Sequence, residues 1–342
     1  MQGRDILILR GEEVSSLLKG RELDLIDLVG RAYGAHGRGN SSLPHSSFLL
    51  FPDRKRDRII ALPAYLGEQF EVSGIKWIAS FPDNINKGIE RASAVLILNS
   101  MKTGRPEVIM ESSVISAKRT AASAALAART LHGPVAPERV GFIGCGLINY
   151  QIAKFLLAVW PDIRSFRIFD LSSSRANQFG KDCARLSSEL KTEVAGSSLS
   201  VLRDCPVVSF ATTAARPHVS DLSNCPPQAT ILHVSLRDIS PEAILACDNI
   251  VDDADHICQA GTSVHLAQQL VGHKEFITAT LAEVLIGEKA VRRDHDRPVV
   301  FSPFGLGVLD VAVAKLVTML AVDSKVGTVL ESFIPDAAVA RL

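Results

Sequence analysis

Residues 139–157 read RVGFIGCGLINYQIAKFLL, which predicts a strand, a glycine-containing turn and a helix in succession. Gly144 permits the tight turn, and Gly146 lets an anionic group approach the backbone closely. The first turn of the helix would offer that anion unpaired N–H groups and the positive end of the helix dipole. The segment therefore predicts a dinucleotide pyrophosphate site formed by Gly144, Cys145, Gly146, Leu147 and Ile148.

Asp170 indicates which dinucleotide binds. It closes the next predicted strand, FRIFD, somewhat past the usual offset of about 20 residues from the glycine turn. A carboxylate there would accept hydrogen bonds from the ribose hydroxyls and repel a 2′-phosphate, so NAD is favoured over NADP, although Arg175 could serve a phosphate. The alternative is an ordinary strand–turn–helix in which Asp170 caps a helix. Asn149 replaces the third glycine of GxGxxG, so we expect looser packing of helix on strand.

Strands and helices alternate along most of the chain after Ser116. The segment SAKRTAASAALAARTLHG (116–133) predicts an alanine-rich helix, and the strand segments that follow are RVGFIG, FRIFD, PVVSFATT, ATILHVS, NIVDD and PVVFS. This order is typical of a parallel sheet with helices on both faces. Ligands bind at the carboxyl ends of such strands. We therefore expect a site there that includes Thr212, Thr213, Ser235, Leu236 and Gly305.

The first third of the chain has a different pattern. A strand at 6–9 and an amphipathic helix over 20–36 precede the strand segments RIIALPAYLG, VSGIKWIASF, RASAVLILNS and PEVIMESS, which predict an antiparallel or mixed sheet. The segment GVLDVAVAKLVTMLAV (307–322) predicts a long amphipathic helix that returns to this part. The predicted fold is α/β: a Rossmann-type dinucleotide-binding domain (119–309) plus an α+β substrate and dimerisation domain (1–118 and 310–342).

Three cations lie at positions where a purely structural role would cost stability. Strand alternation places Lys76 on one face with Val72 and Ile78, and a lysine on an apolar face needs an anionic partner or a low pKa. The alternative is an edge strand with the lysine in solvent. Lys118 and Arg119 fall in the first turn of the predicted helix, where cations oppose the dipole. A bound carboxylate or pyrophosphate would offset this unfavourable interaction of Lys118 and Arg119 with the dipole. The alternative is that they form a surface salt bridge.

Asp238 follows the strand ATILHVS and is a candidate for proton transfer. Ser240, before Pro241, already fits the helix-cap position, so Asp238 is left to handle a proton or a water. His233 alternates into an apolar strand and is predicted to be structural. His256 and Cys258 lack a third ligand at metal-binding spacing, so we expect no metal.

Composition excludes several classes of protein. The chain of 342 residues carries 37 Lys and Arg against 37 Asp and Glu, and such a balance argues against nucleic-acid binding. No apolar run reaches the ~18 residues that a membrane span needs, and charges interrupt the apolar N-terminal stretch, so we expect neither a membrane partner nor a secretory signal. Six cysteines without a CxxC pair indicate reduced thiols in a cytoplasmic protein.

The chain resembles the ornithine cyclodeaminase/μ-crystallin family over nearly its whole length. The segments that carry the resemblance are SGIKW, TGRPEVIMESSVISAKRTAASAALAAR, GFIGCG and SPFGLGVLD. Within that family, RIIALPAYLG, SGIKW, IERASAVLIL and GFIGCGLI look like the SbnB-type N-((2S)-2-amino-2-carboxyethyl)-L-glutamate dehydrogenases. Those enzymes act in 2,3-diaminopropionate synthesis for siderophores and other natural products.

The resemblance implies a homodimer, in which the sheets of two substrate domains pair, and a set of residue roles. Lys76 and Arg119 would hold a substrate carboxylate near the nicotinamide, in a substrate site that includes Arg91 and Gly305, and Asp238 would act as general acid/base and orient a water. Bound NAD would contact Gly144, Gly146, Asp170, Thr212 and Ser235. The family usually has a basic residue before the RIIALP-type strand, but SLPHSSFLLF has no Arg or Lys, so His45, Arg54 and Arg58 are candidates to compensate.

The implied reaction is oxidation of a secondary-amine amino acid to an imine, followed by hydrolysis. For N-(2-amino-2-carboxyethyl)-L-glutamate the products would be 2,3-diaminopropionate and 2-oxoglutarate, with NADH released. An ornithine cyclodeaminase-like ammonia lyase, in which the hydride returns, and a ketimine reductase both stay open. So does a non-catalytic μ-crystallin-like binding protein, although such a protein needs neither Lys76 nor an acid/base at Asp238.

Overall fold

The computed structural model describes residues 4–291 and 297–335, which divide into two compact units. Of the described residues, the first unit contains 4–21, 35–119 and 306–335, and the second contains 22–34, 120–291 and 297–305. The chain passes from one unit to the other before helix α2 (Glu22–Gly37), again within α2, within helix α3 (Ser113–His132) and after Gly305. The functional domains predicted at 1–118 with 310–342 and at 119–309 stay a prediction, and their residues 1–3, 292–296 and 336–342 lie outside the described residues.

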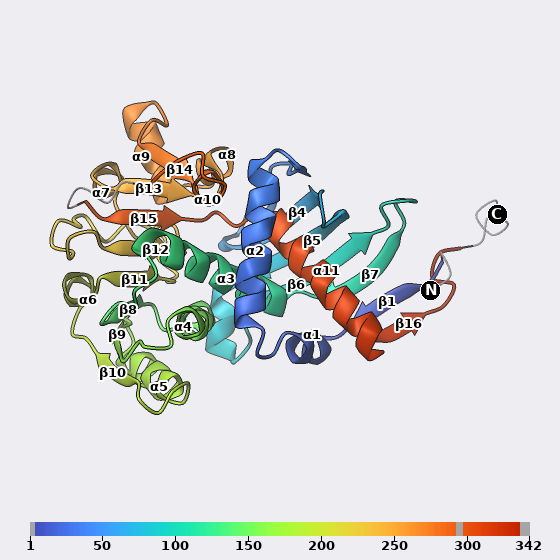
Figure 1. The fold of residues 1–342 in the computed structure, drawn as a ribbon, viewed down its shortest axis with the longest axis horizontal. Coiled ribbons are helices and arrows are strands. Elements are labelled where there is room, and N and C mark those ends of the chain that lie inside the picture. The colour runs from blue at the N-terminus through green and yellow to red at the C-terminus, as the bar shows by residue number, and fades with distance from the viewer. Residues whose placement is uncertain (1–3, 292–296, 336–342) are drawn as a thin grey trace. The chain divides into compact units, whose positions relative to one another are not determined.

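The first unit contains a mixed sheet of eight strands within the described residues (Figure 1). The strands are β1 (Ile6–Leu9), β2 (Ser41–Ser42), β3 (Ser47–Phe51), β4 (Arg54–Leu66), β5 (Val72–Ser80), β6 (Ala92–Asn99), β7 (Pro106–Glu111) and β16 (Thr328–Leu330). Their order is β16-β1-β7-β6-β5-β4-β2, with β3 also on β4. Only the β1–β7 pair is parallel among these ladders, which confirms the predicted mixed sheet.

Helix α11 (Gly307–Ser324) lies across β4, β5 and β6 of this sheet (Figure 1). Every residue from 307 to 314 is buried, so the first two turns are apolar nearly all round and the predicted amphipathic pattern is wrong there. Gly307 makes the close contact possible, because a Cβ at this position would lie 3.2 Å from the Leu62 carbonyl oxygen. Shorter helical elements of the unit are α1 (Gly11–Leu17) and η1 (Pro82–Lys87).

The second unit contains a fully parallel sheet, as predicted, which also has eight strands in the part of the chain that is described. The strands are β8 (Val140–Ile143), β9 (Ser165–Phe169), β10 (Lys191–Val194), β11 (Val207–Phe210), β12 (Thr230–His233), β13 (Asp248–Val251), β14 (Ile277–Thr280) and β15 (Val299–Ser302). Their order is β10-β9-β8-β11-β12-β15-β13-β14. The sequence patterns missed β10 and β14, which are short strands with exposed residues.

Helices connect these strands, and several begin at a side-chain cap. They are α4 (Leu147–Val159), α5 (Ser173–Ala184), α6 (Ser198–Asp204), α7 (Pro241–Leu245), α8 (Ala254–Ile257), α9 (Ser263–Val271) and α10 (Leu281–Leu285). Ser240 accepts from the Ala243 N–H, which confirms its predicted cap role. Successive residues of β8 supply two cores: Ile143 joins the cluster around Val208, while Phe142 packs edge-on against Phe166.

Helix α3 begins earlier than the sequence pattern predicts. Its first turn starts at Ser113 because the Glu111 carboxylate accepts the N–H groups of Ser113 at 2.6 Å and Val114 at 3.3 Å. Lys118 and Arg119 therefore lie in the second turn, and the predicted placement in the first turn is wrong. The helix dipole acts mainly within the first turn, so it is not what selects these cations.

No helix among the described residues is both long and apolar enough to cross a membrane. All six cysteines are free thiols. Burial raises the pKa of Cys183, Cys205 and Cys247 to about 12, so these thiols stay protonated at neutral pH.

Candidate active site

The turn after β8 has the geometry of a phosphate cradle. Gly144 has φ +88°, and a Cβ there would lie 2.5 Å from the Ala211 carbonyl oxygen, so only glycine fits. Gly146 is exposed, with open space around it, and precedes α4 without any side-chain cap. The turn lies between β8 and β11, where the strand order of the sheet reverses. Ligands of open parallel sheets bind at that switch point, so the residues present fit a dinucleotide.

Asn149 ties this turn to the sheet. Its side chain is fully buried, and its Nδ2 donates to the carbonyl oxygens of Ile143 at 3.0 Å and Gly144 at 2.6 Å. The Ser209 hydroxyl on β11 donates to its Oδ1 at 2.7 Å. The predicted loosening at the third glycine position is therefore wrong, because the amide fills the space and satisfies polar groups there.

Asp170 holds the other side of the turn. Its Oδ2 accepts the Cys145 N–H and its Oδ1 accepts the Ser172 N–H, both at 2.9 Å. Each carboxylate oxygen keeps a further lone pair for a ribose hydroxyl. Arg175 lies exposed in the first turn of α5. Of the remaining turn residues, Leu147 is exposed and Ile148 is half-buried.

Asp170→Ala is expected to narrow the preference for NAD(H) over NADP(H). Loss of charge-assisted hydrogen bonds of ~1.5–3 kcal/mol should weaken NAD(H) binding roughly tenfold or more, while repulsion of a 2′-phosphate disappears. Fluorescence titration with both dinucleotides measures the ratio of the dissociation constants for NADP(H) and NAD(H). Asp182→Ala on the outer part of α5 is the control, and tighter NADP(H) binding by the unaltered chain would contradict the assignment.

Asp238 is fully buried at the carboxyl end of the same sheet. The hydroxyls of Thr212 and Ser235 donate to its two oxygens, and Nε2 of His233 lies 3.4 Å and Nε2 of His218 3.6 Å away. Burial alone would raise the pKa of Asp238, but hydrogen bonds from His233, Ser235 and Thr212 hold it below its usual value. The carboxylate is therefore ionised at neutral pH and is built to accept protons or hydrogen bonds.

The loop around Asp238 is fixed and locally strained. Leu236 has φ +70°, and its carbonyl accepts the Ser263 N–H at 2.7 Å. The buried ring of His233 lies 3.2 Å from the Asp238 backbone nitrogen and 3.3 Å from the Ser302 hydroxyl, which fits its predicted structural role. Thr213 is exposed beside Thr212. The sequence thus placed these residues correctly at strand ends, but Thr212 and Ser235 contact Asp238 directly.

A buried cluster of charges lies in the first unit. Lys76 is 1% exposed on β5, and its Nζ donates to Asp310 Oδ2 at 2.7 Å and to the Ser116 hydroxyl at 3.2 Å. Arg119 Nε donates to Asp310 Oδ1 at 3.0 Å. Since β5 lies between β4 and β6, the alternative of a solvent-facing edge lysine is excluded. Burial lowers the pKa of Lys76 to about 8, with Asp310 opposing the shift and Arg119 adding to it.

This Lys76–Asp310–Arg119 cluster has one more positive than negative charge, so a substrate carboxylate would balance it. Sequence reasoning missed Asp310, although a lone acid in the apolar run GVLDVAVAKL was a signal. The Nζ of Lys118, the other predicted cation of this helix, donates to the Leu18 carbonyl at 3.2 Å.

The other basic residues predicted for the substrate site also belong to the first unit. Arg91 directly precedes β6, and burial lowers the pKa of its guanidinium. Arg54 stacks over the Phe51 ring at 4.2 Å, His45 is exposed, and Arg58 is half-buried on β4.

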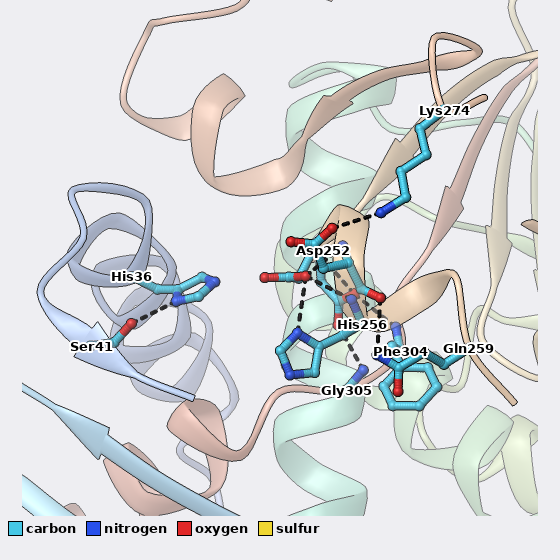
Figure 2. Close-up of polar contacts among 10 residues, drawn as sticks. His36, Ser41, Asp252, His256, Gln259, Lys274, Phe304 and Gly305 are labelled. Atoms are coloured by element: carbon cyan, nitrogen blue, oxygen red, sulfur yellow. Dashed lines mark hydrogen bonds and ion pairs between the residues drawn. The ribbon is translucent and has the colours of Figure 1, made fainter. Parts of the chain in front are cut away.

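Gly305 is held by a buried carboxylate that sequence reasoning did not identify. Figure 2 shows Asp252 directed at the backbone of Phe304 and Gly305, whose N–H groups donate to it at 2.8 and 2.6 Å. Burial raises the pKa of Asp252 to about 6, against the opposing effect of these N–H groups. A substrate would therefore have to contact Gly305 through atoms other than its N–H.

A family model, a curated relative and solved structures each match this chain over most of its length. The family model described as ornithine cyclodeaminase/mu-crystallin matches residues 7–325. The N-((2S)-2-amino-2-carboxyethyl)-L-glutamate dehydrogenase of Staphylococcus aureus is 27% identical and covers 96% of this chain and 99% of its own length. An archaeal alanine dehydrogenase dimer with bound NAD superposes with a TM-score of 0.85 at 27% identity, over 96% of this chain and 99% of that one. The Δ1-pyrroline-2-carboxylate reductase of Thermococcus litoralis is 24% identical to this chain. The two share the fold with a TM-score of 0.87, over 94% of this chain and 99% of that one.

Proposed function

The chain belongs to the ornithine cyclodeaminase/mu-crystallin family, and we propose that it is an NAD-dependent oxidoreductase acting on the CH–NH bond of an amino acid. The observation that carries the proposal is the pairing, at one edge of the parallel sheet, of the Gly144–Asp170 dinucleotide turn with the buried Asp238 carboxylate. A protein that only binds a small ligand has no need of an ionised buried carboxylate beside that turn.

The proposed substrate is the secondary amine N-(2-amino-2-carboxyethyl)-L-glutamate, and the products are 2,3-diaminopropionate and 2-oxoglutarate. The Staphylococcus aureus relative, which bears the name of that activity, supports this choice. The excess positive charge at Lys76 and Arg119 also supports a substrate with carboxylates.

In the proposed reaction, two residues bind the substrate and a third transfers the proton. Lys76 and Arg119 hold a substrate carboxylate and orient the Cα–H bond. When bound, NAD⁺ supplies the hydride acceptor. Asp238 takes a proton from the substrate nitrogen as the imine forms, and then positions the water that adds to the imine carbon. Thr212 and Ser235 keep the carboxylate oriented for both steps.

Incubation of the purified protein with NAD⁺ and candidate amino acids, followed by NADH absorbance and product analysis, tests the proposal. Release of 2-oxoglutarate together with NADH is the expected result. Ammonia release from ornithine without net NADH would instead indicate a cyclodeaminase, and NADH consumption with cyclic imines a ketimine reductase. Ligand binding without turnover of any of these compounds would contradict an enzymatic function.

We further propose a homodimer formed through the outer face of the first unit's sheet. Cross-strand neighbours on this face are apolar and only partly buried, and Trp77 at its centre is 42% exposed beside Ala61 and Val95. An apolar sheet face of this kind is typical of a subunit interface. The archaeal alanine dehydrogenase with bound NAD is described as a dimer.

Trp77→Glu is expected to convert the dimer to a monomer, because it places a charge in the centre of an apolar contact. Light scattering at micromolar concentration measures the mass. Leu270→Glu, at a 57% exposed position on α9, is the control and should leave the mass unchanged. A monomeric unaltered chain would contradict the proposal.

A further inference from the structure

We propose that His218 carries protons between the buried Asp238 carboxylate and solvent, a role that rests on the proposed function. His218 lies on the loop between β11 and β12, and its side chain is 44% exposed. Its Nε2 is 3.6 Å from Asp238 Oδ1. That distance exceeds a hydrogen bond, so transfer uses one bridging water or a rotation of the half-exposed ring.

The other groups that face Asp238 either do not exchange protons near neutral pH or are fully buried. Thr212 and Ser235 are hydroxyl donors that do not titrate near neutral pH. The His233 ring is fully buried against Ser302. Arg237 stays charged and donates to the Ala260 carbonyl. Among the groups described around this carboxylate, His218 is the one half-exposed imidazole.

The backbone fixes His218 next to Asp238. The N–H groups of His218 and Val219 both donate to the Asp238 carbonyl, at 2.8 and 2.9 Å, and the Ser240 N–H donates to the Val219 carbonyl at 2.8 Å. A parallel bridge pairs Val219 with Ile239. These bonds tie the loop that carries the imidazole to the loop that carries the carboxylate, as a proton relay requires.

The proposed reaction needs a path by which protons leave Asp238 for solvent. A secondary ammonium substrate, NAD⁺ and water yield a ketone, a primary ammonium, NADH and one free proton. The hydride leaves from Cα and the proton from nitrogen, and the C–N bond breaks after water adds to the imine carbon. Asp238 receives the proton while fully buried, so each turnover requires its transfer outward before the next begins.

Nitrogen-15 NMR of the cofactor-free protein tests the contact itself. Replacing Asp238 by Asn should change the imidazole signals of His218, because the carboxylate beside Nε2 influences which nitrogen carries the proton. The signals of His273, which is half-exposed beside Glu275, should stay unchanged. Unchanged His218 signals would overturn the relay.

His218→Gln tests the role in turnover. We expect kcat to fall roughly tenfold or more, with KM and NAD⁺ affinity retained, and added imidazole to restore the rate. His273→Gln is the matched control and should retain full activity. Full turnover of His218→Gln in an active wild-type background would overturn the relay alone, as would a loss that imidazole does not rescue. An inactive wild type would overturn the proposed function together with the relay.

Discussion

Asp238→Asn is expected to lower kcat by roughly 10²–10⁴-fold while NAD⁺ affinity stays nearly unchanged. The amide keeps the size of the side chain and accepts from Thr212 or Ser235, but it cannot take a proton from the substrate nitrogen. Steady-state kinetics with NADH absorbance, together with NAD⁺ titration, separate the two effects.

Two comparisons sharpen this test. Asp221→Asn, an exposed carboxylate of the same unit, should retain kcat. Lys76→Ala should chiefly raise KM, because it would remove the charge-assisted bond that we propose Lys76 makes to the substrate carboxylate. If Asp238→Asn kept near-native turnover, the carboxylate would only hold its loop, and His233 would be the next candidate for the base.

Asp310→Ala is expected to destabilise the protein by about 3–5 kcal/mol, because it leaves two buried cations without their carboxylate. Both Lys76 and Arg119 depend on Asp310, which is fully buried. Urea unfolding monitored by tryptophan fluorescence gives the change in the free energy of unfolding. Asp323→Ala, an exposed acid on the same helix, should change it by less than about 0.5 kcal/mol.

A second substitution distinguishes charge imbalance from lost packing. Adding Lys76→Met to Asp310→Ala removes one unpaired cation and should recover part of the lost stability. A loss below about 1 kcal/mol for Asp310→Ala would mean that the cations relax into solvent, contrary to their burial.

Features that depend on residues close together in the chain were predictable from the sequence. The glycine turn follows from Gly144 and Gly146, because left-handed backbone and close approach demand glycine at fixed spacing. Lys76 stood out as a charge within an apolar strand, and it is 1% exposed. Ser240 before Pro241 marked a helix start, and this freed Asp238 for another role.

Features that depend on distant pairing were not predictable. Asp310 meets Lys76 across 234 positions, and no local spacing encodes that contact. Asp252 likewise finds its partners at Phe304 and Gly305 more than 50 positions later. The early start of α3 depends on the side chain of Glu111, a residue that strand periodicity assigns to the preceding strand. Such contacts follow from tertiary packing rather than from propensity.

The position of β15 between β12 and β13 has a consequence for biosynthesis. A ribosome would release β13 and β14 before the strand that joins them to the rest of the sheet, since β15 starts only at Val299. Until then the nascent chain presents two unpaired strand edges, at β12 and β13, which other chains can capture. Closure must wait for a late, non-local insertion, and such steps are slow because loop entropy is lost before the pairing energy is gained. We therefore expect chaperone dependence during synthesis to be greatest in this interval.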